Sequence, residues 1–349
     1  MRSLTAEFEQ QSDLGEEVTL RRRDLLRGAV AIGAGSIATR ATWAWAAGVV
    51  PFAPGDIFAT CTLLNDPSDD HRGRGRIIHY DANLALKNTL WLDDTTHLLQ
   101  GPRFSPEQVL FAFDAFAHKV VRFAVDGSRL PNLVDAPARA FGSVAFATDG
   151  RFFLGETLVG TGSRLPLKTT LPTIPGSTRL GDGHVFEFDA NGQLRREHAT
   201  PTHGGMAGFQ GVSSIALAPD GRTLVYVSET GPKIFAWDVA TATPLPDIAS
   251  FADASRQFYF DVRFDELGAL YALAGGALEI YDFRSRVLRR SIALPGFGWA
   301  SMSAPRNGNI LLANFFSGEI AKLDLATGAV LQKAQTNAPK ALSGIAQLP

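Results

Sequence analysis

The sequence predicts an all-β fold, a six-bladed β-propeller whose blades are four-stranded antiparallel sheets. A structural unit of about 40 residues recurs along the chain, which is the signature of stacked repeats. The composition agrees, because 34 Gly and 19 Pro among 349 residues supply many turns while 45% apolar residues supply a core. The ends of the chain also look like two parts of one blade.

The clearest unit spans residues 211–248. Ile215 and Leu217 alternate with small residues, and a Pro-Asp-Gly-Arg turn at 219–222 leads into a second apolar run at 224–227. Because Pro fixes φ and Gly accepts positive φ, this segment predicts a hairpin. A Gly-Pro break then precedes a third run, and a weaker fourth run closes the unit.

Each unit is marked by an aromatic or apolar residue at the end of its third strand, followed by Asp. The six pairs are Tyr80-Asp81, Val125-Asp126, Phe188-Asp189, Trp237-Asp238, Tyr281-Asp282 and Leu323-Asp324. Their spacings are 45, 63, 49, 44 and 42 residues. The long interval contains residues 160–182, which we interpret as a loop insertion, and a second insertion is expected at 65–75.

The two ends of the chain are expected to share a blade. Residues 342–346 resemble the first strand of the clearest unit, but no second strand follows them. At the other end, residues 56–63, 76–81 and 86–91 supply second, third and fourth strands without a first. A C-terminal strand that completes the N-terminal blade leaves no open sheet edge. Residues 56–349 are therefore predicted to form one closed domain.

Residues 1–46 are predicted to be a twin-arginine (Tat) signal peptide that is removed. Arg22 and Arg23 begin the pattern of two Arg, one variable residue, two apolar residues and a basic one, and an apolar run at 28–38 follows. Ala44-Trp45-Ala46 offers a cleavage site, which makes 47–55 a linker. We expect a periplasmic protein with the Tat translocase as its partner during export. The competing interpretation, a retained membrane anchor, is disfavoured by the short apolar run, so no stable membrane anchor is expected.

Charge and cysteine content narrow the function further. The predicted signal peptide carries six Arg and six acidic residues, so the mature chain keeps the formal charge of −2. A chain with no excess of basic residues gives no electrostatic reason to expect nucleic-acid binding. The only cysteine, Cys61, alternates with Ile57 and Ala59 on one strand face, which predicts a core position and no internal disulfide. We expect a monomer.

Three stretches carry a family resemblance: LVYVSETGPKIFAWD at 224–238, FFLGETLVG at 152–160 and GHVFEFD at 183–189. They resemble the six-bladed NHL and gluconolactonase/strictosidine-synthase-like propellers, in which a strand ends in an acid or Asn before a Gly-containing third strand that ends in Asp. In the lactonases and esterases of that superfamily, Glu, Asn and Asp at the starts of the innermost strands hold a calcium or zinc ion on the axis. The resemblance implies the same kind of metal-dependent hydrolase.

The axial positions of this chain depart from that pattern. Counting back from each hairpin turn, they are Gln100, Gly142, Ser213, Phe260, Ala300 and Ser343, none of which is a carboxylate. A hard cation normally requires carboxylate ligands, and only Asp261, one position away, supplies one in this layer. A displaced calcium or zinc ion, with Glu156, Glu229, Asp261 and Asn314 as its candidate ligands, is the remaining possibility. The sequence contains no GxSxG, HExxH, CxxCH or P-loop motif to name catalytic residues.

Another set of polar residues is expected on one face of the ring. The loops from second to third strands and the loops between blades open on the same face, called here the loop-rich face. The residues expected to line a funnel at its centre are Asn65, Arg103, Glu156, His203, Glu229, Asp261, Trp299 and Asn314. Two functions follow: binding of a small molecule or protein partner in the funnel, or hydrolysis of a lactone or ester by a metal-dependent enzyme. Glu156 and Glu229 have a structural alternative, in which they cap strands or pair with Arg103.

Overall fold

The computed structural model describes residues 49–349 apart from 67–68, 94, 96–98, 116, 135–138, 158–182, 203–210, 229–230 and 252–257, with only the backbone at 69–72. The predicted signal peptide with Arg22 and Arg23, the insertion at 160–182, and the candidate residues His203 and Glu229 therefore lie outside the described residues. No described segment forms a helix with the length and hydropathy that a membrane crossing needs.

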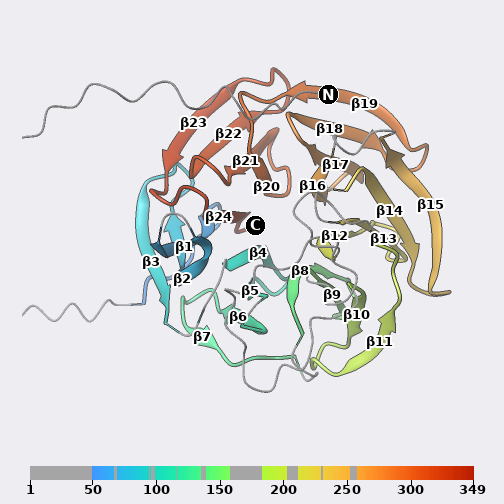
Figure 1. Ribbon diagram of the computed structural model, residues 1–349, viewed down its shortest axis with the longest axis horizontal. Helices are drawn as coiled ribbons and strands as arrows, with labels where there is room; N and C mark the ends of the chain where they lie inside the picture. Colours follow the sequence, from blue (N-terminus) through green and yellow to red (C-terminus); the bar gives the residue numbers. More distant parts are fainter. Residues whose placement is uncertain are drawn as a thin grey trace, which may run out of the picture. The chain divides into compact units, whose positions relative to one another are not determined.

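Six four-stranded antiparallel sheets surround a central axis, which confirms the predicted fold class (Figure 1). From the innermost strand outward, blade 1 is β24 (Leu342–Gln347), β1 (Ile57–Asp66), β2 (Asp69–Tyr80) and β3 (Leu86–Leu92); blade 2 is β4 (Leu99–Phe104), β5 (Leu110–Asp114), β6 (Lys119–Phe123) and β7 (Arg129–Leu130); blade 3 is β8 (Phe141–Phe146), β9 (Phe152–Glu156), β10 (Val185–Phe188) and β11 (Leu194–His198). Blade 4 is β12 (Val212–Leu217), β13 (Thr223–Ser228), β14 (Lys233–Asp238) and β15 (Thr243–Ser250); blade 5 is β16 (Tyr259–Phe264), β17 (Ala269–Ala274), β18 (Ala277–Asp282) and β19 (Val287–Ala293); blade 6 is β20 (Trp299–Met302), β21 (Asn309–Asn314), β22 (Glu319–Asp324) and β23 (Val330–Gln335).

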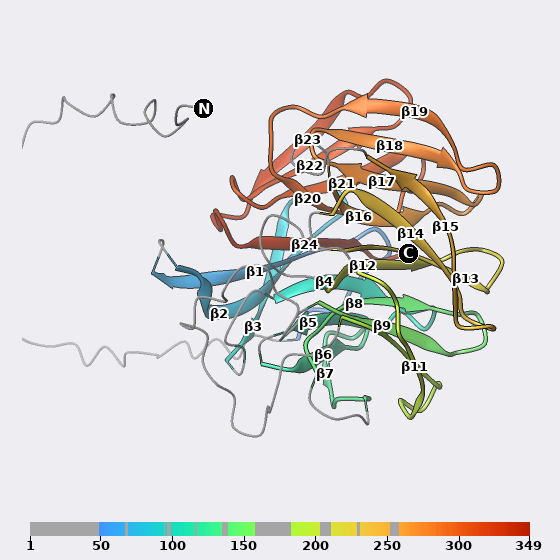
Figure 2. The ribbon, with the colours of Figure 1, turned by 45° about the vertical axis from the view of Figure 1, so that its right-hand side comes forward.

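The ring closes through the C-terminal strand, as the sequence predicts. β24 pairs antiparallel with β1, with Ile345 opposite Ala59 and Gln347 opposite Ile57. It packs between the inner strands of blades 2 and 6, so the last strand of the chain lies among the blades rather than on the surface (Figure 2). Leu342 and Ile345 are fully buried there. Closure therefore satisfies the backbone groups of β1 and removes an exposed sheet edge.

Apolar side chains fill the spaces between adjacent blades. One such layer, between blades 2 and 3, is largely aromatic and contains Phe111, Phe113, Phe141, Phe152, Phe186 and Phe188. Cys61 lies in the equivalent layer beside blade 6 and is fully buried, which confirms its predicted core position. Burial raises the pKa of its thiol to about 11, so the thiolate required of a nucleophile is disfavoured.

The hairpin between β1 and β2 differs from the expected loop at 65–75. Most of that segment is strand, because Arg74 pairs with Leu63, and Asp69 pairs with Asp66. Gly73 makes this pairing possible, since a Cβ at that position would lie 2.1 Å from the carbonyl oxygen of Leu63. The insertion therefore lengthens the two strands into an arm, and the exposed Asn65 lies near its tip rather than at the end of the blade.

A buried polar cluster secures the closure beside the start of β1. The Asp56 carboxylate accepts hydrogen bonds at 2.6 Å from His79 and from Lys87, and one at 2.8 Å from the backbone of Ala53. The Asp56 carbonyl accepts the backbone N–H of Leu348 at the end of β24. Burial lowers the pKa of His79 below its ordinary value of 6.5, against the opposing effect of Asp56. His79 is therefore neutral at pH 7.

We expect acidification to destabilise the protein partly through His79. A lowered pKa means that the unfolded chain takes up this proton more readily than the folded protein, so stability falls as the pH drops below about 6.5. His79→Gln removes this proton uptake. The fall in melting temperature between pH 7.5 and pH 5 should be smaller in the variant than in the wild type.

The matched control is His184→Gln, because His184 is partly exposed and pairs with Glu197 at the surface. Melting curves at several pH values make the comparison. Parallel pH profiles for the wild type and His79→Gln would rule out this account of the cluster.

Candidate functional site

Every innermost strand carries a β-bulge near its start, and these bulges surround the axis. The bulged residues are Gly142, Ser213, Phe260, Ala300 and Ser343, with Gly101 and Pro102 in blade 2. Five of these residues are the axial positions predicted from the sequence, and the predicted Gln100 lies directly before the sixth bulge. A bulge turns one residue out of the ladder, and in blades 4, 5 and 6 the residue that follows it, Ser214, Asp261 or Ser301, forms a hydrogen bond to a neighbouring inner strand.

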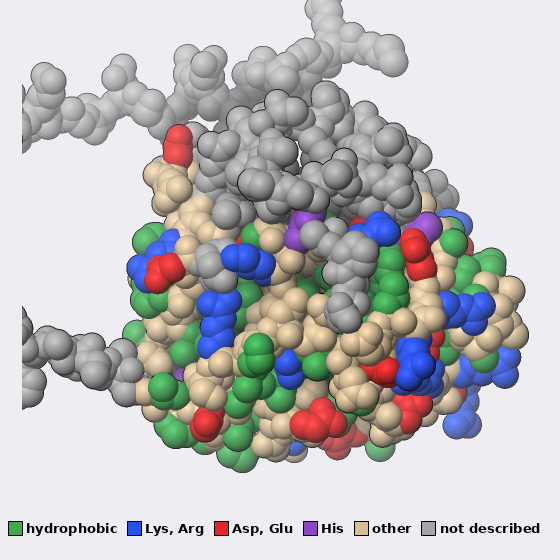
Figure 3. Space-filling model, turned by 90° about the horizontal axis from the view of Figure 1, so that it is seen from below, with side chains coloured by type: hydrophobic (Ala, Val, Ile, Leu, Met, Phe, Trp, Pro, Cys, Tyr) green, Lys and Arg blue, Asp and Glu red, His purple; other side chains and the backbone are tan. Residues whose placement is uncertain are grey.

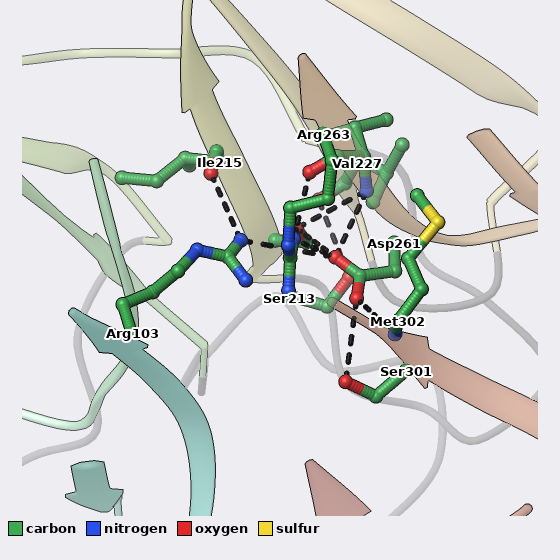
Figure 4. A network of polar contacts seen from close by, with 10 residues as sticks. Arg103, Ser213, Ile215, Val227, Asp261, Arg263, Ser301 and Met302 are labelled. Carbon is green, nitrogen blue, oxygen red and sulfur yellow. Dashed lines mark hydrogen bonds and ion pairs between the residues drawn. The ribbon is translucent and has the colours of Figure 1, made fainter. Parts of the chain in front are cut away.

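Asp261 follows the bulge of β16 and joins three blades. Its Oδ1 accepts the Ser214 hydroxyl of blade 4 at 2.6 Å. Its Oδ2 accepts the backbone N–H of Met302 in blade 6 at 2.9 Å (Figure 4). The Ser301 hydroxyl and the backbone N–H of Val262 also donate to it. Asp261 is only 3% exposed, so its carboxylate has lost most of its hydration. The hydrogen bonds from these donors compensate for that loss.

Two arginines share this carboxylate. Arg263, from the same strand, donates from Nη1 to Oδ1 of Asp261. Arg103 reaches across the axis from blade 2, placing its Nη2 3.9 Å from the same oxygen and 3.4 Å from the carbonyl oxygen of Ile215 (Figure 4). The structure thus brings together two of the predicted site residues, Arg103 and Asp261, and adds Arg263, which sequence reasoning missed. We call Arg103, Asp261 and Arg263 the axial cluster.

Burial dominates the ionisation of the axial cluster. It raises the pKa of Asp261 to about 6, with the positive charge of Arg103 acting in the opposite direction. It lowers the pKa of Arg103 to about 10, opposed by Asp261. The cluster sets two guanidinium groups against one carboxylate and therefore carries an excess positive charge. A divalent cation at Asp261 would face two guanidinium groups, which is unfavourable electrostatically.

Glu156 is held at the end of β9 by its own partners. Its carboxylate lies 3.4 Å from Nη1 of Arg139, just before β8, and accepts the backbone N–H of Gly183, just before β10. The side chain is fully buried. Of the two structural roles considered for Glu156, capping a strand end fits this geometry, and its arginine partner is Arg139. The described parts of the chain contain no group of three His, Cys, Asp or Glu residues arranged to hold a metal ion.

Asn314 and Trp299 organise the loops above blade 6. The Asn314 amide donates to the carbonyl of Phe297 at 2.9 Å and accepts the backbone N–H groups of Phe316 and Ser317. Trp299 is 1% exposed and donates to the carbonyl of Pro295 at 3.0 Å, so its ring is part of the core. Both candidate residues are placed on the loop-rich face, and both support its loops from beneath.

The loops that Asn314 fixes display phenylalanines that the sequence analysis did not single out. Phe297 and Phe316 stack at 5.6 Å between ring centroids and are 58% and 50% exposed. Phe258 connects them to the axis, because it packs edge-on against Phe297 at 6.5 Å and against the bulge residue Phe260 at 4.8 Å. We call Phe258, Phe260, Phe297 and Phe316 the aromatic ledge. A Gly-Phe-Gly at 296–298 and a Phe pair at 315–316 are the sequence signals that could have revealed it.

Strand register shows which second-strand ends are equivalent. Glu156 pairs with Phe141, and Asn314 pairs with Trp299, so these two hold the same position in their blades as predicted. Asn65 does not share it, because Cys61 occupies that position in blade 1. In blade 2 the equivalent residue is Asp114, a buried carboxylate that sequence reasoning missed. In blade 4 it is Ser228, the neighbour of Glu229.

Charged side chains on the face seen in Figure 3 are interspersed rather than gathered by sign, since Lys and Arg lie among Asp and Glu with apolar side chains between them. The described residues of this face therefore form no continuous basic surface. Oppositely charged side chains also form ion pairs elsewhere in the protein, such as Lys333 with Glu319.

Comparisons with known proteins support the fold. No family model matches the chain, and no curated protein matches it. Among solved structures, one chain of a nidogen/laminin complex superimposes with a TM-score of 0.59 at 12% identity, covering 84% of this chain and 98% of that one. A protein of unknown function from Bacteroides caccae gives a TM-score of 0.58 at 12% identity, covering 85% and 99%. At such identities the similarity shows the propeller fold and nothing finer.

We expect Glu156→Gln to lower the free energy of unfolding by about 1–3 kcal/mol, because Arg139 would lose a buried charged acceptor. The matched control is Glu319→Gln, which breaks a partly exposed pair and should change stability by less than about 0.5 kcal/mol. Urea unfolding of both variants measures the difference. Equally small effects would show that Glu156 does not stabilise the fold.

Proposed function

We propose that this propeller is a binding protein that holds a small molecule at the centre of its loop-rich face. The observation that carries the proposal is the aromatic ledge, which begins at the axis with Phe260 and ends with two exposed, stacked rings. Aromatic side chains with a few fixed polar groups nearby are typical of small-molecule sites. Here the polar groups are those of the axial cluster, since Phe260 directly precedes Asp261.

The ledge is organised before any ligand arrives. Gly298 has a φ of +101°, and a Cβ at this position would lie 2.7 Å from the Phe316 ring, so glycine is needed for the two loops to approach. Asn314 then ties the same loops together through hydrogen bonds. A site that is already ordered loses little conformational entropy on binding, which favours affinity.

The geometry favours binding over metal-dependent hydrolysis. Both Asp261 oxygens already accept hydrogen bonds, and two guanidinium groups compensate the carboxylate charge. Glu156 and Asn314 hold loops in the same way. A protein partner is the second candidate ligand, because exposed aromatic side chains are also enriched at protein interfaces and one fold neighbour comes from a nidogen/laminin complex.

The apolar fluorescent probe N-phenyl-1-naphthylamine tests the ledge. We expect the wild type to bind it and Phe316→Ser to weaken binding by about tenfold, because most of an apolar contact worth about 1.5–3 kcal/mol is lost. Leu267→Ser is the control, since Leu267 is 94% exposed on the hairpin at the other end of blade 5. Equal affinity in the wild type and in both variants would refute the ledge as a binding surface.

We further propose that the protein is exported to the periplasm by the Tat pathway, on the sequence pattern around Arg22 and Arg23. This pathway carries folded proteins, which suits a ring closed by its last strand. Replacing both arginines by Lys should trap the precursor in the cytoplasm, as cell fractionation would show. Normal amounts of processed protein in the periplasm would refute the assignment.

A further inference from the structure

The axial cluster holds more positive charge than its own residues compensate. Among the described residues, Asp261 is the one carboxylate acting on Arg103, and Arg263 contacts the same carboxylate oxygen. That oxygen also accepts the Ser214 hydroxyl and the Val262 backbone N–H. One negative charge therefore serves two guanidinium groups, and its hydrogen-bonding capacity is already used.

The donors of these arginines are incompletely satisfied. A guanidinium has five N–H donors, and the interactions of Arg103 with described residues are one 3.4 Å hydrogen bond to Ile215 and the 3.9 Å approach to Asp261. Nε of Arg263 is buried without a partner among those residues, on a side chain only 6% exposed. A buried charge without its counterion is strongly unfavourable. The described residues thus leave room for one additional acceptor with negative charge.

The site can be reached from solvent at the level of the bulges. The Arg103 side chain is 16% exposed, and the bulge residues Ser213, Phe260 and Ser343 are also partly exposed. Phe260 belongs to the aromatic ledge, so a molecule on the ledge lies next to the cluster. Arginine prefers planar or tetrahedral oxyanions, which accept two parallel hydrogen bonds from its fork.

We propose that the axial cluster binds the oxyanion of the ligand, a carboxylate or a phosphate, through the free donors of Arg103. This inference rests on the proposed binding function and specifies its ligand as an acid. It also reverses the sign of the ion expected from the family resemblance. Arg103 supplies the binding contact, whereas Asp261 positions Arg103 and Arg263 keeps the site positive.

Titration calorimetry with inorganic phosphate and with acetate, at constant ionic strength, tests the proposal. We expect saturable binding of at least one of them to the wild type and a loss of about tenfold or more in Arg103→Met, which keeps an unbranched apolar stem and removes the charge. Arg103→Lys should bind more weakly than the wild type, because it keeps the charge but lacks the fork. Arg289→Met, which breaks an exposed pair with Asp282, is the control and should bind as the wild type does.

The naphthylamine probe separates this inference from the proposed function. The probe is compared between the wild type and Phe316→Ser, and urea unfolding of Arg103→Met shows whether that variant is folded. Absence of phosphate and acetate binding to the wild type, or equal binding by Arg103→Met, would overturn the oxyanion site. If Phe316-dependent binding of the probe persisted in that case, the proposed function would stand. If the wild type bound phosphate or acetate but not the probe, the ledge would be refuted. The comparison of the wild type with Arg103→Met would then still decide whether the oxyanion site exists.

Discussion

The hydrogen-bonded pairing of β24 with β1 is the constraint on which the rest of the structure depends. A single blade cannot bury both of its faces, so each blade relies on two neighbours, and the first and last blades become neighbours only when the ring closes. Closure also fixes the distance across the axis. Arg103 in blade 2 and Asp261 in blade 5 can meet only because every blade between them, in both directions, is held in place.

The β-bulge is repeated in every innermost strand, but only some blades place a polar or charged side chain next to it. All six innermost strands bulge at the same level, but only blade 5 follows its bulge with a carboxylate, while blades 3, 4 and 6 have serine there. Two of those serines become hydrogen-bond donors to Asp261, and two arginines balance its charge. One carboxylate and two guanidinium groups therefore leave an excess of positive charge at the axis.

The loop-rich face combines this polar centre with an apolar surface. The ledge depends on backbone conformation as much as on side chains, because Gly298 permits the close approach and Asn314 satisfies the loop N–H and carbonyl groups. Asn314 and Glu156, which the sequence analysis proposed as ligands, accept backbone N–H groups of neighbouring loops.

The sequence alone determined the six blades, their four-stranded order and the closing strand, because local alternation, turn residues and a regular period are visible along the chain. It also located the axial positions, since they lie at a fixed distance from each hairpin turn. It did not determine that the segment at 65–75 extends two strands, or that Asp114 is equivalent to Glu156, because register depends on pairing between strands. The axial cluster and the aromatic ledge were decided by tertiary structure, which brings together residues from blades that are distant in sequence, and no local pattern records which side chains will face one another across a closed ring.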